Sequence, residues 1–364
     1  MNVLIIGNNP KHAKVFSMFA DKVFLLLQRQ YTGINRLSKE LYDYNLLYSD
    51  IEYDTNEYIL KRNLEIRKLI KLYSIDIVFS NRKDDMVQAK IATWGIKRKP
   101  LMLVTFHNSI AWADDTKARL MSVMIKCFCD GCICLARFMY EKLIHYGVKK
   151  TKLLYLPNTI QFENYKVKDD YSLYDNKVRI CFTAVIYPLK NQEIIVNTIN
   201  ALKYKYNFEV HLYGDYIDKD YYQKLKSMIK DCGLENIVFL DGQVDNDEIR
   251  EILPQCDIYL SSTTIEMSPY NILEAKASAL PILASRVLGQ KDLIDDGVDG
   301  ILYDINDQKD LIIKLDCLIS DIDLRKRLGL NARKSVSTSK SYLEASKKLK
   351  AFIDDLSHDR RISE

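Results

Sequence analysis

The chain has 364 residues, 48% of them apolar, which excludes one small core and favours two domains of about 150 to 180 residues each. Residues 1–160 hold 25 Lys and Arg against 15 Asp and Glu, a net charge of +10, whereas the remainder holds 28 against 34, a net charge of −6. A basic first half suits phosphates, acidic glycans or an anionic membrane as partners, or is simply a solvated Lys-rich surface.

No run of eighteen apolar residues occurs, and residues 1–10 lack the layout of a signal peptide. We therefore expect a cytoplasmic protein with reduced thiols. Four of its eight cysteines cluster in CFCDGCIC, residues 127–134, which raises a metal site as one interpretation. Because all four lie within eight residues, and Cys132 and Cys134 alternate with apolar neighbours, we favour buried strand positions.

The chain alternates apolar runs with helical patterns. Apolar runs occur at residues 2–7, 22–27, 75–80, 101–106 and 132–136, with helical patterns at residues 84–94 and 116–128 among those between them. Such runs between helices predict parallel strands covered on both faces. The sequence therefore predicts a first α/β domain over residues 1–160.

Residues 152–177 interrupt this alternation with Pro157, several Asp and Asn, and clustered tyrosines, and we interpret them as the interdomain connection. Apolar runs then return at residues 177–185, 208–214, 236–242, 257–262, 281–285 and 300–303. They predict a second domain over residues 161–340, with ligands at the carboxyl ends of the strands in a cleft between the domains. The last helix, within residues 341–364, is expected to pack back on the first domain.

The stretch EMSPYNILE, residues 266–274, places two carboxylates eight residues apart at a predicted helix start. Ser268 can cap free amides, and Pro269 suits the first helical position. The amino end of a helix binds anions, most naturally a phosphate or diphosphate. Because carboxylates accept hydrogen bonds from vicinal hydroxyls, Glu274 suits a ribose and Glu266 a sugar beyond the diphosphate. An exposed helix residue and an ordinary loop carboxylate are equally good interpretations of these residues alone.

Residues 261–285 resemble the Glu-x7-Glu signature of retaining glycosyltransferases of the GT-B fold, family four, the group 1 glycosyltransferases. Residues 103–112 (LVTFHNSIAW), 183–199 (TAVIYPLKNQEIIVNTI) and 285–303 (SRVLGQKDLIDDGVDGILY) resemble other family segments in the expected order. The resemblance covers about residues 100–305 and is weaker before them. It implies an α/β fold with two Rossmann-like, doubly wound parallel sheets, an acceptor-binding first domain and a second domain that binds a nucleoside diphosphate sugar.

The resemblance also implies roles for single residues. Lys190 is expected to bind the diphosphate, Glu266 the donor sugar and Glu274 the ribose, and His107 is expected to contact donor or acceptor hydroxyls. The backbone of the signature would join the donor site. The residues concerned are Ser268, Pro269, Tyr270, Asn271 and Gly289.

The sequence departs from the family pattern at several positions. Five positions before the lysine the family usually has an arginine, and here that position is Val185. We name Arg286 as the candidate substitute, since a missing cation at a leaving group weakens catalysis. Met267 replaces a small residue, which would narrow the sugar site, and the first loop, residues 7–16, lacks the usual double glycine.

Two acidic pairs, Asp245 with Asp247 and Asp321 with Asp323, lie at predicted helix starts, where carboxylates cap. We interpret them as caps, and the resemblance implies that no metal or other cofactor is needed.

The implied activity is transfer of a hexose or N-acetylhexosamine, with retained configuration, to a hydroxyl of a glycan or lipid-linked oligosaccharide in bacterial surface polysaccharide biosynthesis. The amphipathic stretch 117–128, with Lys117, Arg119 and Lys126, is a candidate contact with an anionic membrane, and peripheral attachment at the inner face of the cytoplasmic membrane is our hypothesis. We expect no nucleic-acid partner. Two alternatives stay open: a non-hydrolysing nucleotide-sugar epimerase, and a non-catalytic GT-B binding or scaffold protein.

Overall fold

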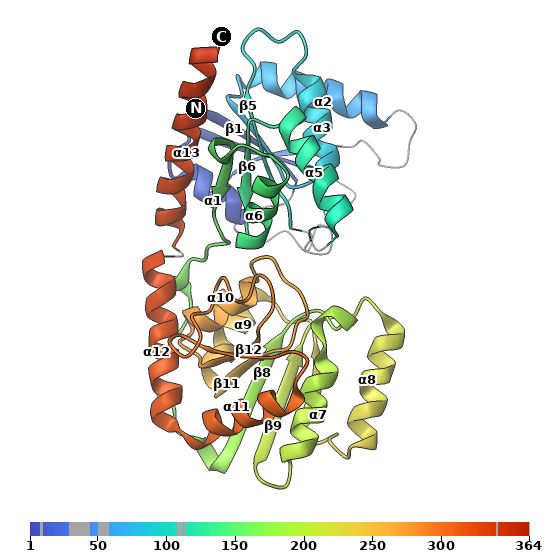
Figure 1. The fold of residues 1–364 in the computed structure, drawn as a ribbon, viewed down its shortest axis with the longest axis vertical. Helices are drawn as coiled ribbons and strands as arrows, with labels where there is room; N and C mark the ends of the chain where they lie inside the picture. Colours follow the sequence, from blue (N-terminus) through green and yellow to red (C-terminus); the bar gives the residue numbers. More distant parts are fainter. Residues whose placement is uncertain are drawn as a thin grey trace. The chain divides into compact units, whose positions relative to one another are not determined.

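The computed structural model describes residues 1–7, 10–28, 44–49, 58–107, 112, 114–339 and 341–363. The chain divides into two compact units (Figure 1). The first unit comprises Met1–Pro157 and Tyr342–Glu364, and the second comprises Asn158–Ser341. Each unit has its own parallel sheet with helices on both faces, so the predicted pair of doubly wound sheets is confirmed.

The sheet of the first unit has seven strands in the order β3-β2-β1-β4-β5-β6-β7, all pairs parallel. Its inner strands are short apolar runs with both faces buried, as parallel sheets require. The strands are β1 (Asn2–Ile6), β2 (Lys22–Gln28), β3 (Asn45–Ser49), β4 (Ile77–Ser80), β5 (Leu101–Thr105), β6 (Gly131–Cys134) and β7 (Leu153–Tyr155).

Helices cover both faces of this sheet. On one face, α1 (Pro10–Ser17) and α13 (Tyr342–Ser363) pack on β1, β2, β4 and β5. On the other, α2 (Tyr58–Leu72) and α3 (Lys83–Ala92) form a second cluster, and α5 (Asp115–Phe128) lies beside α3 (Figure 1). The remaining helix, α6 (Arg137–His145), lies next to β6 and β7. The final helix of the chain thus belongs to the first unit.

The strand β7 was not predicted from the sequence. Residues 152–177 were expected to form a connection, yet Leu153, Leu154 and Tyr155 pair with β6 before the chain leaves the sheet. A three-residue edge strand next to a proline carries too little alternation to stand out in a sequence, and pairing with β6 is what specifies it.

The sheet of the second unit has six parallel strands in the order β10-β9-β8-β11-β12-β13. Its apolar residues form one continuous core with those of the surrounding helices. The strands are β8 (Lys177–Thr183), β9 (Asn207–Tyr213), β10 (Val238–Gly242), β11 (Ile258–Ser261), β12 (Ile282–Ser285) and β13 (Ile301–Tyr303).

Helices cover both faces of this second sheet as well. On one face lie α7 (Gln192–Leu202), α8 (Lys219–Asp231) and α11 (Gln308–Ser320), and on the other α9 (Asn246–Ile252), α10 (Tyr270–Ala277) and α12 (Ile322–Ser339) (Figure 1). Gly329 of α12 has no room for a side chain, because a Cβ there would lie 2.2 Å from the Ala279 carbonyl oxygen at the end of α10. This close approach fixes α10 against α12.

The cysteine cluster is structural. Cys132 and Cys134 lie on β6 with no exposed surface, Cys129 is also buried, and Cys127 is exposed at the end of α5. Burial raises the pKa of the Cys132 thiol, which keeps it protonated. The prediction of buried strand positions is confirmed for Cys132 and Cys134.

Two further features bear on the predictions. Of the helices in the described part of the chain, none has a stretch of sufficient length and hydropathy to cross a bilayer. Residues 8 and 9 of the first loop, where the double glycine was missing, and residues 108–111 after His107 lie outside the described residues.

Candidate functional site

Three neighbouring strands of the second sheet end at the predicted signature. β8 and β12 flank β11, so the loops after Thr183, Ser261 and Ser285 leave the same edge of the sheet. The direction of the strand order reverses between β8 and β11, because the chain continues from β8 to β9 on one side and from β11 to β12 on the other. The crevice at such a switch point is where open α/β sheets bind ligands.

Hydrogen bonds join the loop after β8 to the loop after β11. The hydroxyl of Ser262 donates to the Lys190 carbonyl over 2.7 Å, and the Thr264 amide donates to the Leu189 carbonyl over 2.8 Å. Ser285 at the end of β12 donates in turn to the Thr263 carbonyl over 2.5 Å. The backbone that carries Lys190 is therefore held by the strands that flank the signature.

Lys190 and Glu266 form an ion pair between Nζ and Oε1, although 76 positions separate them in sequence. Both side chains are mostly buried, at 24% and 18% exposure. Lys190 ends the short 3-10 helix Pro188–Lys190, and Asn191 then adopts a left-handed conformation, φ 50°, before α7 begins. The structure thus brings together the residues predicted for the diphosphate and the donor sugar, each satisfied by the other.

Gly289 lies directly against the backbone of the signature loop. Its φ is +87°, and a Cβ built there would lie 2.2 Å from the Glu266 carbonyl oxygen and 2.7 Å from that of Met267. The Glu266 amide donates to the Leu288 carbonyl over 3.2 Å. Only glycine permits this approach. Gly289 therefore sets the position of Glu266, and Met267 is buried beside it.

The start of α10 differs from the sequence prediction. The helix begins at Tyr270, and Pro269 precedes it with an extended backbone, φ −68° and ψ 126°. Ser268 does not cap the helix, because its Oγ accepts a hydrogen bond of 2.9 Å from the Asn158 amide. The Asn158 side chain donates to the Ser268 carbonyl over 2.6 Å. The predicted Ser-Pro cap is therefore wrong, since a residue 110 positions away takes the hydroxyl.

Asn271 anchors the first turn of α10 to the end of β8. Its Nδ2 donates to the Thr183 carbonyl over 2.8 Å, and its Oδ1 accepts from the Ile272 amide over 2.9 Å. Pro269 is buried, and Tyr270 is half-buried against the core of the unit. Pro269, Tyr270 and Asn271 thus hold the end of α10 in place through their side chains.

Glu274, in the second turn of α10, is half-buried and accepts a hydrogen bond of 3.2 Å from the Tyr165 hydroxyl. Tyr165 is 7% exposed, and burial followed by the Glu274 carboxylate raises the pKa of its hydroxyl, so it remains a donor. The Arg250 guanidinium lies 5.5 Å from the centre of the Tyr165 ring. Tyr165 was not predicted as a site residue, because nothing in residues 152–177 connects it to a carboxylate 109 positions later.

Arg286 follows β12, and its hydrogen bonds go to groups other than Lys190 and Glu266. Its guanidinium pairs with Asp296 and donates to the Leu302 carbonyl over 3.2 Å. Val185, the position where the family usually has arginine, is exposed on the loop after β8. Its neighbour Ala184 limits Gly214, where a Cβ would lie 2.0 Å from the Ala184 carbonyl oxygen.

His107 lies in the first unit, two residues beyond the carboxyl end of β5. Its ring meets that of His12 edge to face, with centroids 5.8 Å apart. Desolvation by the surrounding protein lowers the pKa of His107, and burial lowers that of His12 to about 3. Both rings are therefore neutral at pH 7, and His107 keeps an exposed edge that can serve as a hydrogen-bonding group.

The first carboxylate of each acidic pair caps a helix. Asp245 accepts from the amides of Asp247 and Glu248 over 2.9 Å each, and Asp321 accepts from the Leu324 amide over 2.9 Å. Within the described residues, no three His, Cys, Asp or Glu side chains are grouped closely enough to hold a metal ion.

Comparison with known proteins supports a specific family. The model for "Glycosyl transferases group 1" matches residues 164–335. An uncharacterized glycosyltransferase of Methanocaldococcus jannaschii, MJ1178, is 24% identical over 64% of this chain and 62% of its own length. An undecaprenol-linked glycan α-1,4-N-acetyl-D-galactosaminyltransferase of Campylobacter jejuni is 24% identical over 75% of this chain and 73% of its own length. The chain therefore spans less than two thirds of the length of MJ1178.

Solved structures share the fold of the whole chain. The Anabaena HepE protein in complex with UDP and glucose superposes with a TM-score of 0.80 at 17% identity, over 97% of this chain and 99% of its own. A glycosyltransferase from Rickettsia africae gives 0.80 at 19% identity, over 98% of each chain. This chain is therefore similar to the group 1 glycosyltransferases over residues 164–335, and it shares the GT-B fold with these solved structures over nearly its whole length.

Proposed function

We propose that the protein transfers a hexose or N-acetylhexosamine from a nucleoside diphosphate sugar to a hydroxyl of a glycan or lipid-linked oligosaccharide, with retained configuration, in bacterial surface polysaccharide synthesis. The observation that carries the proposal is the Lys190–Glu266 pair beside the amino end of α10 and the Gly289 turn. Two of the similar proteins suggest the chemistry by analogy, since one acts on an undecaprenol-linked glycan and another was solved with UDP and glucose.

The pair suggests how the donor would bind. A diphosphate at the amino end of α10 would take Lys190 from Glu266 and so release a carboxylate for the sugar hydroxyls. Lys190 and the helix dipole then face the charge that gathers on the leaving diphosphate, which is the largest catalytic contribution such a site can make. Glu274, oriented by Tyr165, would accept hydrogen bonds from the ribose.

The reaction needs no protein base in this scheme. The acceptor oxygen bonds to the anomeric carbon as the bond from that carbon to the diphosphate oxygen breaks. The acceptor proton passes to the departing diphosphate on the same face of the sugar. His107, as a neutral imidazole of the acceptor unit, would contact a hydroxyl of donor or acceptor, and neither metal nor cofactor takes part.

A thermal-shift screen of UDP-, GDP- and ADP-sugars tests donor binding, because a ligand at a hundred times its Kd adds about 2.7 kcal/mol to the free energy of unfolding. The selected donor is then incubated with and without acceptors, and the anomeric configuration of the product is read by NMR. Donor binding without transfer or slow hydrolysis would favour a scaffold. Epimer formation from the donor alone would favour an epimerase.

A further inference from the structure

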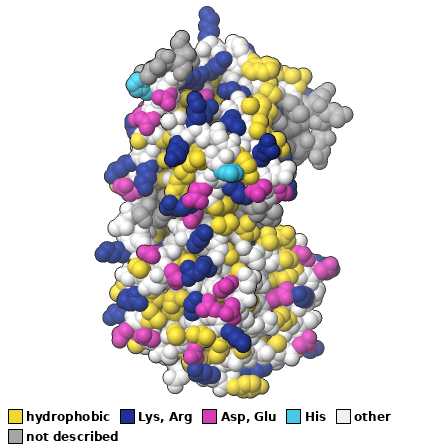
Figure 2. All heavy atoms as spheres, in the orientation of Figure 1, with side chains coloured by type: hydrophobic (Ala, Val, Ile, Leu, Met, Phe, Trp, Pro, Cys, Tyr) yellow, Lys and Arg dark blue, Asp and Glu magenta, His cyan; other side chains and the backbone are white. Residues whose placement is uncertain are grey.

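Exposed apolar side chains of the first unit gather on one helical layer. Among the described residues of that unit, nine large hydrophobic side chains are exposed, and six of them lie on α2, on α5 or just after α3. A grouping of this kind on a water-facing surface indicates an interaction site. Figure 2 shows hydrophobic side chains beside Lys and Arg at the surface of this unit. The six are Leu60, Leu64, Leu72, Trp94, Leu120 and Val123.

Helix α2 has an outward stripe that is both apolar and basic. Leu60, Leu64 and Leu72 are 65%, 58% and 62% exposed, while Ile66 and Ile70 of the same helix pack into the core. Lys61, Lys68 and Lys71 are exposed between the leucines. An α-helix of fifteen residues is about 22 Å long. Exposed leucines flanked by lysines along such a length are typical of helices that lie in a membrane interface.

The loop after α3 continues this stripe. Arg67 of α2 donates to the Ala92 carbonyl over 3.1 Å and also to the Trp94 carbonyl, so the loop is tied to the helix. Gly95 makes the turn with φ +69°. Trp94 is 70% exposed, and tryptophan in this setting is favoured at the boundary between lipid and water.

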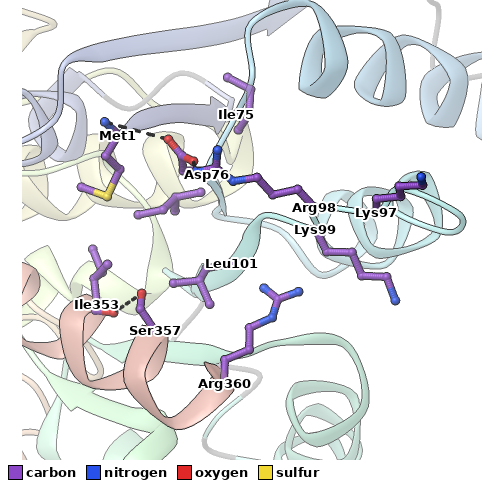
Figure 3. Close-up of a pocket in the computed structure, with 11 residues that line it drawn as sticks. Met1, Ile75, Asp76, Lys97, Arg98, Lys99, Leu101, Ile353, Ser357 and Arg360 are labelled. Atoms are coloured by element: carbon purple, nitrogen blue, oxygen red, sulfur yellow. Dashed lines mark hydrogen bonds and ion pairs between the residues drawn. The ribbon is translucent and has the colours of Figure 1, made fainter. Parts of the chain in front are cut away.

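A basic pocket lies where this loop enters β5. Lys97, Arg98 and Lys99 approach it from the loop and Arg360 from α13, around a cavity of about 230 Å³ (Figure 3). Asp76 pairs with Arg98 at 2.5 Å and is the carboxylate of the lining. Across the part of the chain that the structure describes, no carboxylate pairs with the exposed Lys97 or Lys99. The pocket thus has an excess of positive charge.

We propose that the outward face of α2, the loop 93–99 and this basic pocket together dock on an anionic phospholipid bilayer, with a headgroup phosphate in the pocket. Charge complementarity selects the partner, because lysines beside exposed leucines and a tryptophan match an anionic interface. On α5, Lys117 pairs with Asp114 at 3.6 Å and Lys126 donates to the Tyr146 carbonyl over 3.0 Å, while Arg119 is exposed.

The inference rests on the proposed use of a lipid-linked acceptor, which a docked enzyme would meet at the membrane. Docking is measured without donor or acceptor, so its failure and the failure of transfer are separate results. Flotation with phosphatidylglycerol-containing vesicles at low salt should carry the wild-type protein upward, whereas pure phosphatidylcholine vesicles should not. Lys97→Gln with Lys99→Gln should weaken the partition about thirtyfold. Lys226→Gln with Lys230→Gln, an equal charge change on the exposed face of α8, should leave it unchanged.

Tryptophan fluorescence gives an independent measurement, because the chain has two tryptophans and Trp112 is fully buried. Anionic vesicles should shift the emission of the wild-type protein to shorter wavelength, and Trp94→Phe should abolish the shift. Equal flotation of the Lys97/Lys99 variant and the wild type, or a shift that survives Trp94→Phe, would overturn the proposal.

Two other occupants of the surface have their own signatures. In the first case, inorganic phosphate raises the melting temperature only when Lys97 and Lys99 are present, and the protein does not bind vesicles. This result would assign the pocket to a soluble anion and refute docking. A dimer in solution that Leu60→Gln with Leu64→Gln dissociates would assign the α2 face to a second copy of the chain. Unchanged melting temperatures of all variants in buffer confirm that each is folded.

Discussion

Replacement of Gly289 by alanine tests whether the turn after β12 positions Glu266. The new Cβ would lie 2.2 Å from the Glu266 carbonyl oxygen, about 1 Å inside an ordinary contact, so the signature loop must move by a similar amount. A displacement of about 1 Å at a reacting group costs about a hundredfold in rate. We therefore expect kcat/KM for the selected donor to fall about a hundredfold.

The same substitution also costs stability. Alanine at φ +87° carries about 1–2 kcal/mol of backbone strain, and the overlap with backbone atoms adds about 1–3 kcal/mol. Gly233→Ala provides the matched control, because Gly233 has φ +63° with no atom within 4 Å of the built Cβ. It should show the strain alone, with unchanged catalysis.

The measurements are chemical denaturation of both variants and release of nucleoside diphosphate under initial-rate conditions. If Gly289→Ala and Gly233→Ala lose the same stability, and both retain wild-type kcat/KM, then the contact between Gly289 and the Glu266 backbone does not position the carboxylate.

Three further outcomes are expected. Lys190→Ala should lower kcat about a hundredfold or more while Glu274→Ala mainly raises the Kd for the nucleotide, and equal effects on both constants would contradict the separate roles. Lys276→Met should lower the free energy of unfolding by about 3–5 kcal/mol in chemical denaturation, because it leaves the buried Asp299 carboxylate, 2.6 Å from the lysine, without its cation. A loss below about 1 kcal/mol would show that this carboxylate is neutral or solvated. The hydrogen bond that the His211 ring donates to the Asp241 carboxylate raises the pKa of His211, so protonated His211 stabilises the fold below the pKa of about 6.5 in the unfolded chain, and this contribution is lost as pH rises through the folded pKa. His211→Gln should flatten that part of the pH profile of stability, and an unchanged slope would disprove the linkage.

Local sequence was enough to predict the two parallel sheets. Buried parallel strands must be apolar on both faces, so runs such as residues 2–7 and 257–262 are visible without any partner. The roles of Lys190 and the signature carboxylates came instead from the resemblance to a known family, and they stay predictions. The pairing of Lys190 with Glu266 across 76 positions follows from the adjacency of β8 and β11, which strand order alone decides.

Only the tertiary structure decided which groups the site residues bond to. The sequence assigned the Ser268 hydroxyl to its own helix, whereas Asn158 takes it from a distant loop. It gave no sign that Asp296 pairs with the guanidinium of Arg286, whose role at the diphosphate stays a prediction. Tyr165 gave no signal of its contact with Glu274. Helical and strand periods are local properties that a sequence displays directly, but a hydrogen-bond partner is chosen among all groups that packing brings within about 3 Å, and packing is a property of the whole fold.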